Sequence, residues 1–386
     1  MHVVFAHHEP VDATKARWVA IGRTLAALAR QVPVTWLSPD SAASVDAYFD
    51  NELGTSRPIA LTVKTLPSIR KRLGMTFNGV FFRACRKAVE SLRPGVLWLR
   101  SDKLAAYFAE KLEARRRPLV YEAHLIGELW AQDRKAGAQA ARKLARIERA
   151  VYAGSRGVAA ITQGLLDEIK ARFGFEGPTA VVPSAVDTEL FIPCWNGGDG
   201  RTVAYVGTLQ FWKGLDTLLD ALALAPALRL RIIGGGSDEE QARLAARIKT
   251  LGLQERVELS GRLPQHRLPG ALASVACAVH PLPPEHSIAA RFTSPLKLFE
   301  YMALGLPIVA SDLPSVREAL TDGTNARLFK PGQPKALAAA LQELCSNTNL
   351  AARLGEQAGR DSRHYSYEAR ARRLLALFEQ CRNESQ

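Results

Sequence analysis

The sequence predicts the α/β fold class, with two doubly wound domains that face a cleft. Short β-branched runs alternate with longer amphipathic stretches along the chain, and this alternation is typical of parallel sheets covered by helices on both faces. A length of 386 residues exceeds what one hydrophobic core usually supports, so two domains are expected. A segment rich in proline and glycine, residues 183–201, separates two series of strands.

Ten segments are predicted as strands, because each is a short run rich in β-branched or other apolar residues. Five precede the proline-containing segment, at residues 2–6, 32–37, 96–99, 119–122 and 158–161. Five follow it, at residues 202–206, 229–233, 256–259, 277–280 and 307–310. Helical patterns lie between them, for example at residues 17–30, 138–153, 215–224 and 238–251.

The predicted organisation is an N-terminal domain (1–182), a linker (183–201) and a C-terminal domain (202–364). A last helical segment, residues 365–386, is expected to pack back on the N-terminal domain. Sheets of this class bind ligands at the carboxyl ends of their strands, so candidate residues are sought there.

Composition narrows the class of protein. Apolar residues make up 47% and charged residues 23%, as in soluble globular proteins. No signal peptide and no apolar run of the ~20 residues that span a bilayer are recognised. The five cysteines form no C-x-x-C pair, so we expect a reduced, cytoplasmic setting without structural zinc. The net charge of +13 suits an anionic membrane surface, a phosphorylated substrate or nucleic acid.

Two glycine turns follow strands in the second half. In residues 203–214 (VAYVGTLQFWKG), Gly207 ends a strand and Lys213 precedes a helix, where a cation and free N–H groups suit a diphosphate. In residues 230–237 (LRIIGGGS), Gly234 and Gly235 let a ligand approach the backbone. The alternative is an ordinary strand–helix turn with a solvated lysine for the first, and a glycine turn with no ligand for the second.

Two further segments carry charged residues. In residues 257–263 (VELSGRL), Arg262 is placed to reach a phosphate or to lie in solvent. In residues 293–311 (TSPLKLFEYMALGLPIVAS), Ser294 is predicted to cap a helix with Pro295 at its first position. Lys297 and Glu300 share one face of that helix. Glu300 can bind ribose hydroxyls there with Lys297 nearby, or the two residues can form a surface ion pair.

Taken together, these segments resemble the donor-binding domain of the retaining GT-B glycosyltransferases of family 4 (glycosyl transferases group 1). Residues 181–193 (VVPSAVDTELFIP) add to the resemblance, which is strong over residues 180–330 and weak in the N-terminal half. It implies two Rossmann-like domains, with the acceptor bound by the first and a nucleotide-sugar by the second. No cofactor and no metal are implied, because cationic groups stabilise the departing diphosphate.

The resemblance also implies residue roles: Lys213 neutralises the diphosphate, Glu300 binds the ribose, and the backbone from Thr293 to Lys297 lines the sugar and phosphates. The implied donor-binding residues are Gly207, Lys213, Gly234, Gly235, Arg262, Thr293, Ser294, Pro295, Lys297 and Glu300, and the implied catalytic residues are His124, Lys213 and Glu300.

Two positions depart from the family pattern. The first glutamate of its E-x7-E pair is Phe292 here, and a frequent arginine of the first glycine turn is Thr208. Sugar positioning then falls to other groups, with Glu285, Arg291 and Lys297 as candidates.

Two features of the first half concern the acceptor side. His124 closes the strand segment YEAH, where it can hydrogen-bond a sugar hydroxyl or serve as a buried structural histidine. His7 and His8 are not expected to bind metal, because adjacent residues on a strand point to opposite faces.

Residues 64–93 hold eight Lys or Arg and one acid, interleaved with phenylalanines. This composition predicts contact with an anionic membrane; the alternative is a solvated basic helix whose aromatic side chains face the core. The predicted membrane-contact residues are Arg70, Lys71, Arg72, Phe81 and Phe82.

The sequence therefore predicts a retaining, metal-independent glycosyltransferase, peripheral at the cytoplasmic face of the membrane. Its acceptor is expected to be a lipid-linked molecule or a precursor of a polysaccharide or other glycoconjugate. Two alternatives are an epimerase of the same fold and a weakly catalytic nucleotide-sugar-binding subunit, for which Phe292 is the argument. Nucleic acid is not expected as a partner, because no recognised binding motif accompanies the charge.

Overall fold

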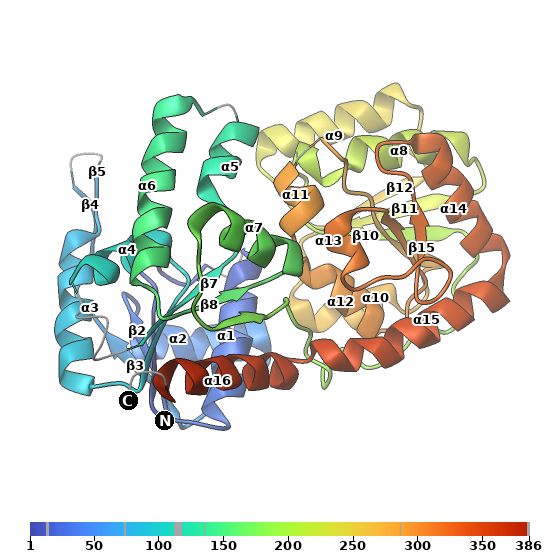
Figure 1. Cartoon of the computed structure of the whole chain (residues 1–386). Helices are drawn as coiled ribbons and strands as arrows, with labels where there is room; N and C mark the ends of the chain where they lie inside the picture. The colour runs from blue at the N-terminus through green and yellow to red at the C-terminus, as the bar shows by residue number, and fades with distance from the viewer. Residues whose placement is uncertain (13–14, 73–74, 112–117, 135, 286, 384–386) are drawn as a thin grey trace. The chain divides into compact units, whose positions relative to one another are not determined.

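The structure is a computed structural model that describes residues 1–12, 15–72, 75–111, 118–134, 136–285 and 287–383. The chain divides into two compact units. Unit 1 comprises Met1–Pro183 and Tyr367–Gln386, and unit 2 comprises Ser184–Ser366. Each unit has one parallel sheet with helices packed against it (Figure 1). The predicted class of two α/β domains is confirmed.

The sheet of unit 1 has seven strands in the order β3-β2-β1-β6-β7-β8-β9. All its neighbouring pairs are parallel, and the order reverses at β1, which lies between β2 and β6. The strands are β1 (Val3–Ala6), β2 (Val34–Ser38), β3 (Leu61–Thr65), β6 (Val96–Leu99), β7 (Leu119–Ala123), β8 (Gly157–Ala160) and β9 (Thr179–Val181).

The central strands of this sheet are buried on both faces, as their sequences VVFA and VLWL require. Large aromatic side chains fill the space between sheet and helices, with the Phe5 and Trp98 ring centroids 4.7 Å apart. The helices of unit 1 are α1 (Ala16–Ala29), α2 (Ala42–Tyr48), α3 (Gly79–Leu92), α4 (Asp102–Lys111), α5 (Gly127–Asp133), α6 (Ala138–Gly154), α7 (Gln163–Phe173) and α16 (Tyr367–Asn383), with a π-turn, η1 (Phe49–Leu53).

The last helix, α16, packs on unit 1 although it follows unit 2 in the chain. Its Phe378 ring lies 6.3 Å from the ring of Trp98. Its approach to β8 is so close that a Cβ atom on Gly157 would lie 2.3 Å from the Cys381 sulfur. A glycine at the start of β8 is therefore a requirement of this packing.

A two-stranded antiparallel hairpin, β4 (Ile69–Arg72) and β5 (Met75–Phe77), stands apart from the main sheet of unit 1. The predicted membrane-contact residues Arg70, Lys71 and Arg72 belong to β4. Only the backbone of these residues is described, so their side chains lie outside the described part of the chain.

The sheet of unit 2 has six strands in the order β12-β11-β10-β13-β14-β15, all parallel. The order reverses at β10, which lies between β11 and β13. The strands are β10 (Thr202–Val206), β11 (Arg229–Ile233), β12 (Val257–Gly261), β13 (Cys277–His280), β14 (Ile308–Ser311) and β15 (Arg327–Phe329).

Alternate side chains of β10 enter two hydrophobic clusters on opposite faces of this sheet. Val203 and Tyr205 pack with residues of α8, α9 and α14, whereas Ala204 packs with residues of α10, α12 and α13. The helices of unit 2 are η2 (Phe211–Lys213), α8 (Leu215–Leu224), α9 (Asp238–Thr250), η3 (Gln265–Arg267), α10 (Leu268–Leu272), α11 (Ser287–Phe292), α12 (Leu296–Ala303), α13 (Pro314–Arg317), α14 (Pro334–Ser346), α15 (Thr348–Ser362) and η4 (Arg363–Tyr365).

The segment predicted as a linker belongs mostly to unit 2, because the boundary lies at Pro183. Val186 N–H donates to Tyr365 C=O (2.8 Å), and Trp195 Nε1 donates to Val275 C=O (2.9 Å). Phe191 is 1% exposed. Prolines and glycines mark irregular backbone in this segment, but its aromatic side chains pack against unit 2.

Candidate functional site

The carboxyl edge of the sheet in unit 2 gathers the residues that the sequence singled out. Gly207 follows β10 and Gly234 follows β11, its parallel neighbour. A Cβ on Gly234 would lie 1.8 Å from Gly207 C=O, and Gly207 has φ 145°, so neither position accepts a side chain without strain. This edge lies where the strand order reverses, the usual ligand position of such sheets.

Two lysines lie at this edge without a carboxylate partner among the described residues. Lys213 ends η2, and its Nζ lies 3.6 Å from the centroid of the Trp212 ring. Lys297 is in the first turn of α12, and its Nζ lies 3.9 Å from the centroid of the Tyr205 ring. These are cation–π contacts and not ion pairs, although the charge of Glu300 acts on Lys297.

Burial and mutual repulsion act on this pair. Burial lowers the pKa of Lys213 to about 8. Burial and the charge of Lys213 lower the pKa of Lys297 well below its ordinary value, against the raising effect of Glu300. Two cations that destabilise each other form a site that an anionic ligand would stabilise.

The amino end of α12 lies next to these lysines, but its start differs from the prediction. The helix begins at Leu296 with Pro295 at the N-cap position and no side-chain cap. The prediction that Ser294 caps the helix is therefore wrong. Ser294 Oγ instead accepts a hydrogen bond from Ser184 N–H at 2.9 Å. Leu298 N–H donates to Pro295 C=O (3.1 Å), so the N–H groups of Leu296 and Lys297 are the ones open to an anion.

Glu300 lies one turn along α12 and is 6% exposed. Its Oε1 accepts a hydrogen bond from Gln265 Nε2 at 2.9 Å. Burial raises the pKa of Glu300, while the hydrogen bond from Gln265 and the charge of Lys297 oppose that rise. The carboxylate is thus held by an amide and is not paired with Lys297 as a surface ion pair.

Buried polar atoms without a partner also gather here. In the part of unit 2 that the structure describes, they are Gln265 Oε1, both ring nitrogens of His280 and Ser311 Oγ. His280 ends β13, Ser311 ends the adjacent β14, and Gln265 follows β12. Buried polar groups are normally hydrogen-bonded, so a cluster of unmet ones at one edge marks a place for a ligand.

The sequence did not single out Gln265, His280 or Ser311. His280 is 1% exposed, and burial, then Lys297 and Lys213, lower its pKa well below the ordinary value. The available signal was position alone, since each of the three follows or ends a predicted strand.

The remaining predicted residues of unit 2 have the following positions. Gly235 follows Gly234, and its C=O accepts Leu209 N–H (3.2 Å), whereas Arg262 is exposed just beyond β12. Thr293 Oγ1 donates to Ala289 C=O (2.7 Å). Phe292, in place of the family glutamate, is 1% exposed and belongs to the interior.

Residues of unit 1 form a second polar group around Glu122, which is completely buried in β7. Glu122 Oε1 accepts from His124 Nε2 (2.7 Å) and from Arg370 of α16. Its Oε2 accepts from Trp98 Nε1 (3.1 Å), and Arg100 Nε lies 3.5 Å from Oε1. Burial opposes ionisation of Glu122, but Arg370 and Arg100 outweigh it and hold its pKa well below the usual range.

This arrangement fixes His124. Its Nε2 donates to Glu122, so Nδ1 is the acceptor and lies 3.4 Å from Arg100 Nη2. Burial and Arg100 lower the pKa of His124 to about 4, against the raising effect of Glu122. The ring is therefore neutral near pH 7, and both nitrogens already have protein partners. Its predicted contact with a sugar hydroxyl stays a prediction.

His7 and His8 follow β1, which ends at Ala6, and their rings are stacked with centroids 5.4 Å apart. The sequence argument that their side chains point to opposite faces of a strand is wrong, because both residues lie beyond the end of β1. His7 Nδ1 accepts from Glu9 N–H (3.2 Å), and His8 Nδ1 is 3.1 Å from Ser101 Oγ. The described residues include no cluster of three or more metal-ligating side chains.

The aromatic residues predicted for membrane contact are not on the surface. Phe81 and Phe82, on α3, are 1% and 8% exposed, so their predicted membrane contact is wrong. An amphipathic helix has an apolar face whether it meets a core or a membrane, and here the core takes it. Within the described ranges, no helix has the length and apolar content of a membrane span.

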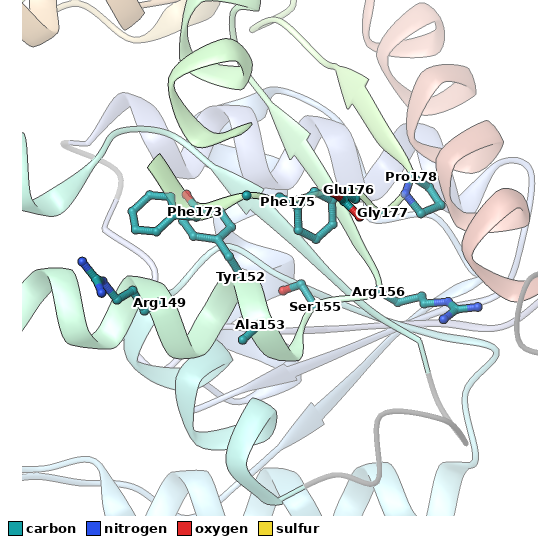
Figure 2. Close-up of a pocket in the computed structure, with 11 residues that line it drawn as sticks. Arg149, Tyr152, Ala153, Ser155, Arg156, Phe173, Phe175, Glu176, Gly177 and Pro178 are labelled. Atoms are coloured by element: carbon teal, nitrogen blue, oxygen red, sulfur yellow. The ribbon is translucent and has the colours of Figure 1, made fainter. Parts of the chain in front are cut away.

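Two hollows lie away from the strand ends described above. One, of about 490 Å³, lies in unit 1 where β8 and β9 begin, and Figure 2 shows Arg149, Tyr152 and Phe173 around it. Another, of about 750 Å³, lies in unit 2 beside Leu304 and Gly305, at the end of α12. Both lie at amino edges of the sheets, so neither contains the candidate residues.

Comparison with known proteins agrees with this geometry. The family model described as glycosyl transferases group 1 matches residues 196–361, and the model described as glycosyltransferase family 4 matches residues 19–190. The phosphatidyl-myo-inositol mannosyltransferase of Mycobacterium leprae is 33% identical over 187 residues, which are 47% of this chain and 46% of that protein. The mannosylfructose-phosphate synthase of Agrobacterium fabrum is 25% identical, over 60% of this chain and 54% of that protein. The chain thus spans about half the length of the curated relatives that it matches.

Solved structures share the fold over nearly the whole chain. The sucrose-phosphate synthase of Thermosynechococcus elongatus has a TM-score of 0.78 at 18% identity and covers 98% of both chains. Anabaena Alr3699/HepE, solved in complex with UDP, has a TM-score of 0.72 at 19% identity and covers 97% of this chain and 99% of that one. With both units matched, the chain belongs to the family 4 glycosyltransferases of the GT-B fold.

Proposed function

We propose that this protein is a retaining, metal-independent glycosyltransferase that uses a nucleotide-sugar donor. The observation that carries the proposal is the pair Lys213 and Lys297 at the carboxyl edge of unit 2, next to the amino end of α12, where neither lysine forms an ion pair with a described residue. Such a site suits a diphosphate, because it combines two point charges with free N–H groups. Structures of Anabaena Alr3699/HepE contain UDP or UDP-glucose, which supports the choice of donor.

In this proposal the two lysines neutralise the diphosphate and Glu300 binds the ribose. The bond from the sugar C1 to the diphosphate oxygen breaks, and the acceptor hydroxyl attacks C1 from the same face. Its proton passes to the departing diphosphate oxygen. Positive charge from protein groups takes the part that a divalent ion has in other transferases.

We further propose that the acceptor is a lipid-linked molecule or a precursor of a polysaccharide or other glycoconjugate at the cytoplasmic face of the membrane. The support is the net charge of +13 and the name of the Mycobacterium leprae relative, which acts on phosphatidyl-myo-inositol. A basic protein is attracted to anionic lipid surfaces.

The test is a thermal-unfolding screen with UDP-, GDP-, ADP- and TDP-sugars, each with EDTA and with Mg²⁺. A ligand that binds only the folded state raises the melting temperature. One donor should raise it equally in EDTA and in Mg²⁺. A strict need for Mg²⁺, or no response to any donor, would contradict the proposal.

A second candidate is a nucleotide-sugar-binding subunit with little catalytic activity. The observation that favours it is Phe292, a buried phenylalanine at the position of a family glutamate. One assay distinguishes the two candidates. The protein is incubated with its donor and a lipid extract that supplies acceptors, and transfer is measured as loss of the sugar nucleotide. Binding without turnover would support the second candidate.

A further inference from the structure

We propose that Gln265 is a specificity-determining residue of the donor site. Gln265 holds the Glu300 carboxylate and accepts a hydrogen bond from the ribose of the nucleotide. The inference rests on the proposed function, because it names a further group at the same site. It concerns how the protein distinguishes ribonucleotides from 2′-deoxyribonucleotides.

The first observation is the orientation of the Gln265 amide. Gln265 begins η3, and its Nε2 donates to Glu300 Oε1 at 2.9 Å. This bond fixes which end of the amide is which, so Oε1 is the acceptor end. Oε1 is buried and has no partner among the described residues. An amide that is used at one end and unmet at the other suits a ligand donor.

The second observation is the state of Glu300. The carboxylate is 6% exposed, and the structure gives it one hydrogen bond, at Oε1. Its Oε2 therefore remains available. Glu300 Oε2 and Gln265 Oε1 are two acceptors on neighbouring side chains, and a ribose offers two adjacent hydroxyl donors. The match of two acceptors with a vicinal diol is the basis of the proposed selectivity.

Two titratable side chains, Lys297 and Tyr301, interact with the charge of Glu300. Lys297, on the same helix, favours the ionised carboxylate of Glu300. Tyr301 is the next residue after Glu300, and the negative charge of Glu300 contributes to the raised pKa of Tyr301. Because Glu300 is buried, the amide of Gln265 is the group that orients it, so Gln265 has both a positioning role and a direct one.

The experiment measures dissociation constants for UDP, GDP and ADP and for their 2′-deoxy counterparts by titration calorimetry. The wild type should prefer the ribose form of its best nucleotide by about tenfold or more. In Gln265→Leu, which has a similar size but no amide, this preference should fall below about threefold. Affinity for the 2′-deoxy form should change little. Gln342→Leu, at an exposed position of α14, is the matched control.

Gln265→Glu gives an independent test, because it keeps the shape of the side chain and replaces the amide, which donates a hydrogen bond to Glu300, by a carboxyl group. In this variant the new carboxylate at position 265 repels that of Glu300. A hydrogen bond between the two carboxyl groups forms again only when one of them takes up a proton. As the pH is lowered from about 7.5 to about 5, affinity for the ribonucleotide should therefore rise more steeply in this variant than in the wild type, in which Gln265 holds Glu300 without a proton. Should the leucine variant fail to fold, the glutamate variant decides alone.

Unchanged ribose preference in Gln265→Leu, or a wild-type pH profile in Gln265→Glu, would overturn the inference and leave the proposed function standing. A wild-type protein that binds none of the nucleotides would overturn the proposed function, and the inference with it.

Discussion

Arg370, in the last helix, donates a hydrogen bond to the buried carboxylate of Glu122, which stands 248 residues earlier in the chain. The same guanidinium donates to Val182 C=O (2.6 Å) and, through Nε, to Thr24 Oγ1 (3.0 Å). One side chain thus joins α16 to α1, to β7 and to the segment after β9. Glu122 in turn orients His124 at the carboxyl edge of the sheet.

Glu122→Gln should lower the free energy of unfolding by about 3–5 kcal/mol, because it leaves Arg100 and Arg370 buried without a counter-charge. The measurement is urea denaturation followed by circular dichroism. Glu90→Gln is the control, since it removes the exposed pair with Arg86 and should cost about 0–1 kcal/mol. Equal effects of the two variants would show that the buried group contributes no special stability.

Lys213→Ala should weaken donor binding by about 1.5–3 kcal/mol, the size of a lost charge-assisted contact, and should abolish transfer. The fold should persist, because Lys213 ends a short turn and makes no ion pair with a residue that the structure describes. Calorimetry with the donor is the measurement, and Lys249→Ala, an exposed lysine of α9, is the control. Wild-type affinity in the Lys213 variant would place the diphosphate elsewhere.

Donor binding should weaken as the pH rises through about 8, the lowered pKa of Lys213. The affinity falls with rising pH because the protonated lysine is the binding form. Below this pKa the free protein already carries the positive charge that the diphosphate needs. Above it, binding must take up a proton, and the affinity falls by up to about tenfold per pH unit. Calorimetry near pH 8.5 in buffers of different ionisation enthalpy should detect that uptake. A pH-independent affinity from pH 7 to pH 9 would contradict the role of Lys213.

Glu300→Gln should raise the donor dissociation constant more than it slows the bound-state reaction. A ribose contact acts in the ground state and the transition state alike, so its loss removes uniform binding. Steady-state kinetics at saturating donor separates the two effects. A collapse of turnover with unchanged donor affinity would instead assign Glu300 to the reacting sugar.

Replacement of Arg70, Lys71 and Arg72 by glutamate should release the protein from vesicles that contain phosphatidylglycerol, while donor binding remains. Each basic residue near such a surface contributes ~1 kcal/mol, and the attraction should fall as salt rises. Co-sedimentation at low and high salt is the measurement. Exposed Arg142, Arg146 and Lys143 of α6, replaced together, are the control of equal charge. Wild-type protein that stays in the supernatant under every condition would end the membrane proposal.

The sequence by itself determined the central strands and the strand-end motifs of unit 2. The predicted strands 96–99, 202–206, 229–233 and 277–280 agree residue for residue with β6, β10, β11 and β13. Strands β6 and β13 are fully buried and β10 and β11 are mostly so, and their apolar residues are a local signal of that position. Gly207 and Gly234 follow such strands directly, and Lys213 lies in the loop after β10, which is why they could be placed at the carboxyl edge.

The tertiary structure alone decided the edge strands other than β12 and the partners of buried charges. The strands β3, β9 and β15, which lie at sheet edges, are short or partly exposed and were not among the predicted strands. An edge strand has one neighbour and a mixed sequence, so pairing and not composition defines it. The contacts of Arg370 with Glu122 and of Gln265 with Glu300 join residues far apart in the chain. Local sequence does not encode such contacts, because a buried charge takes its partner from whichever element the fold packs beside it.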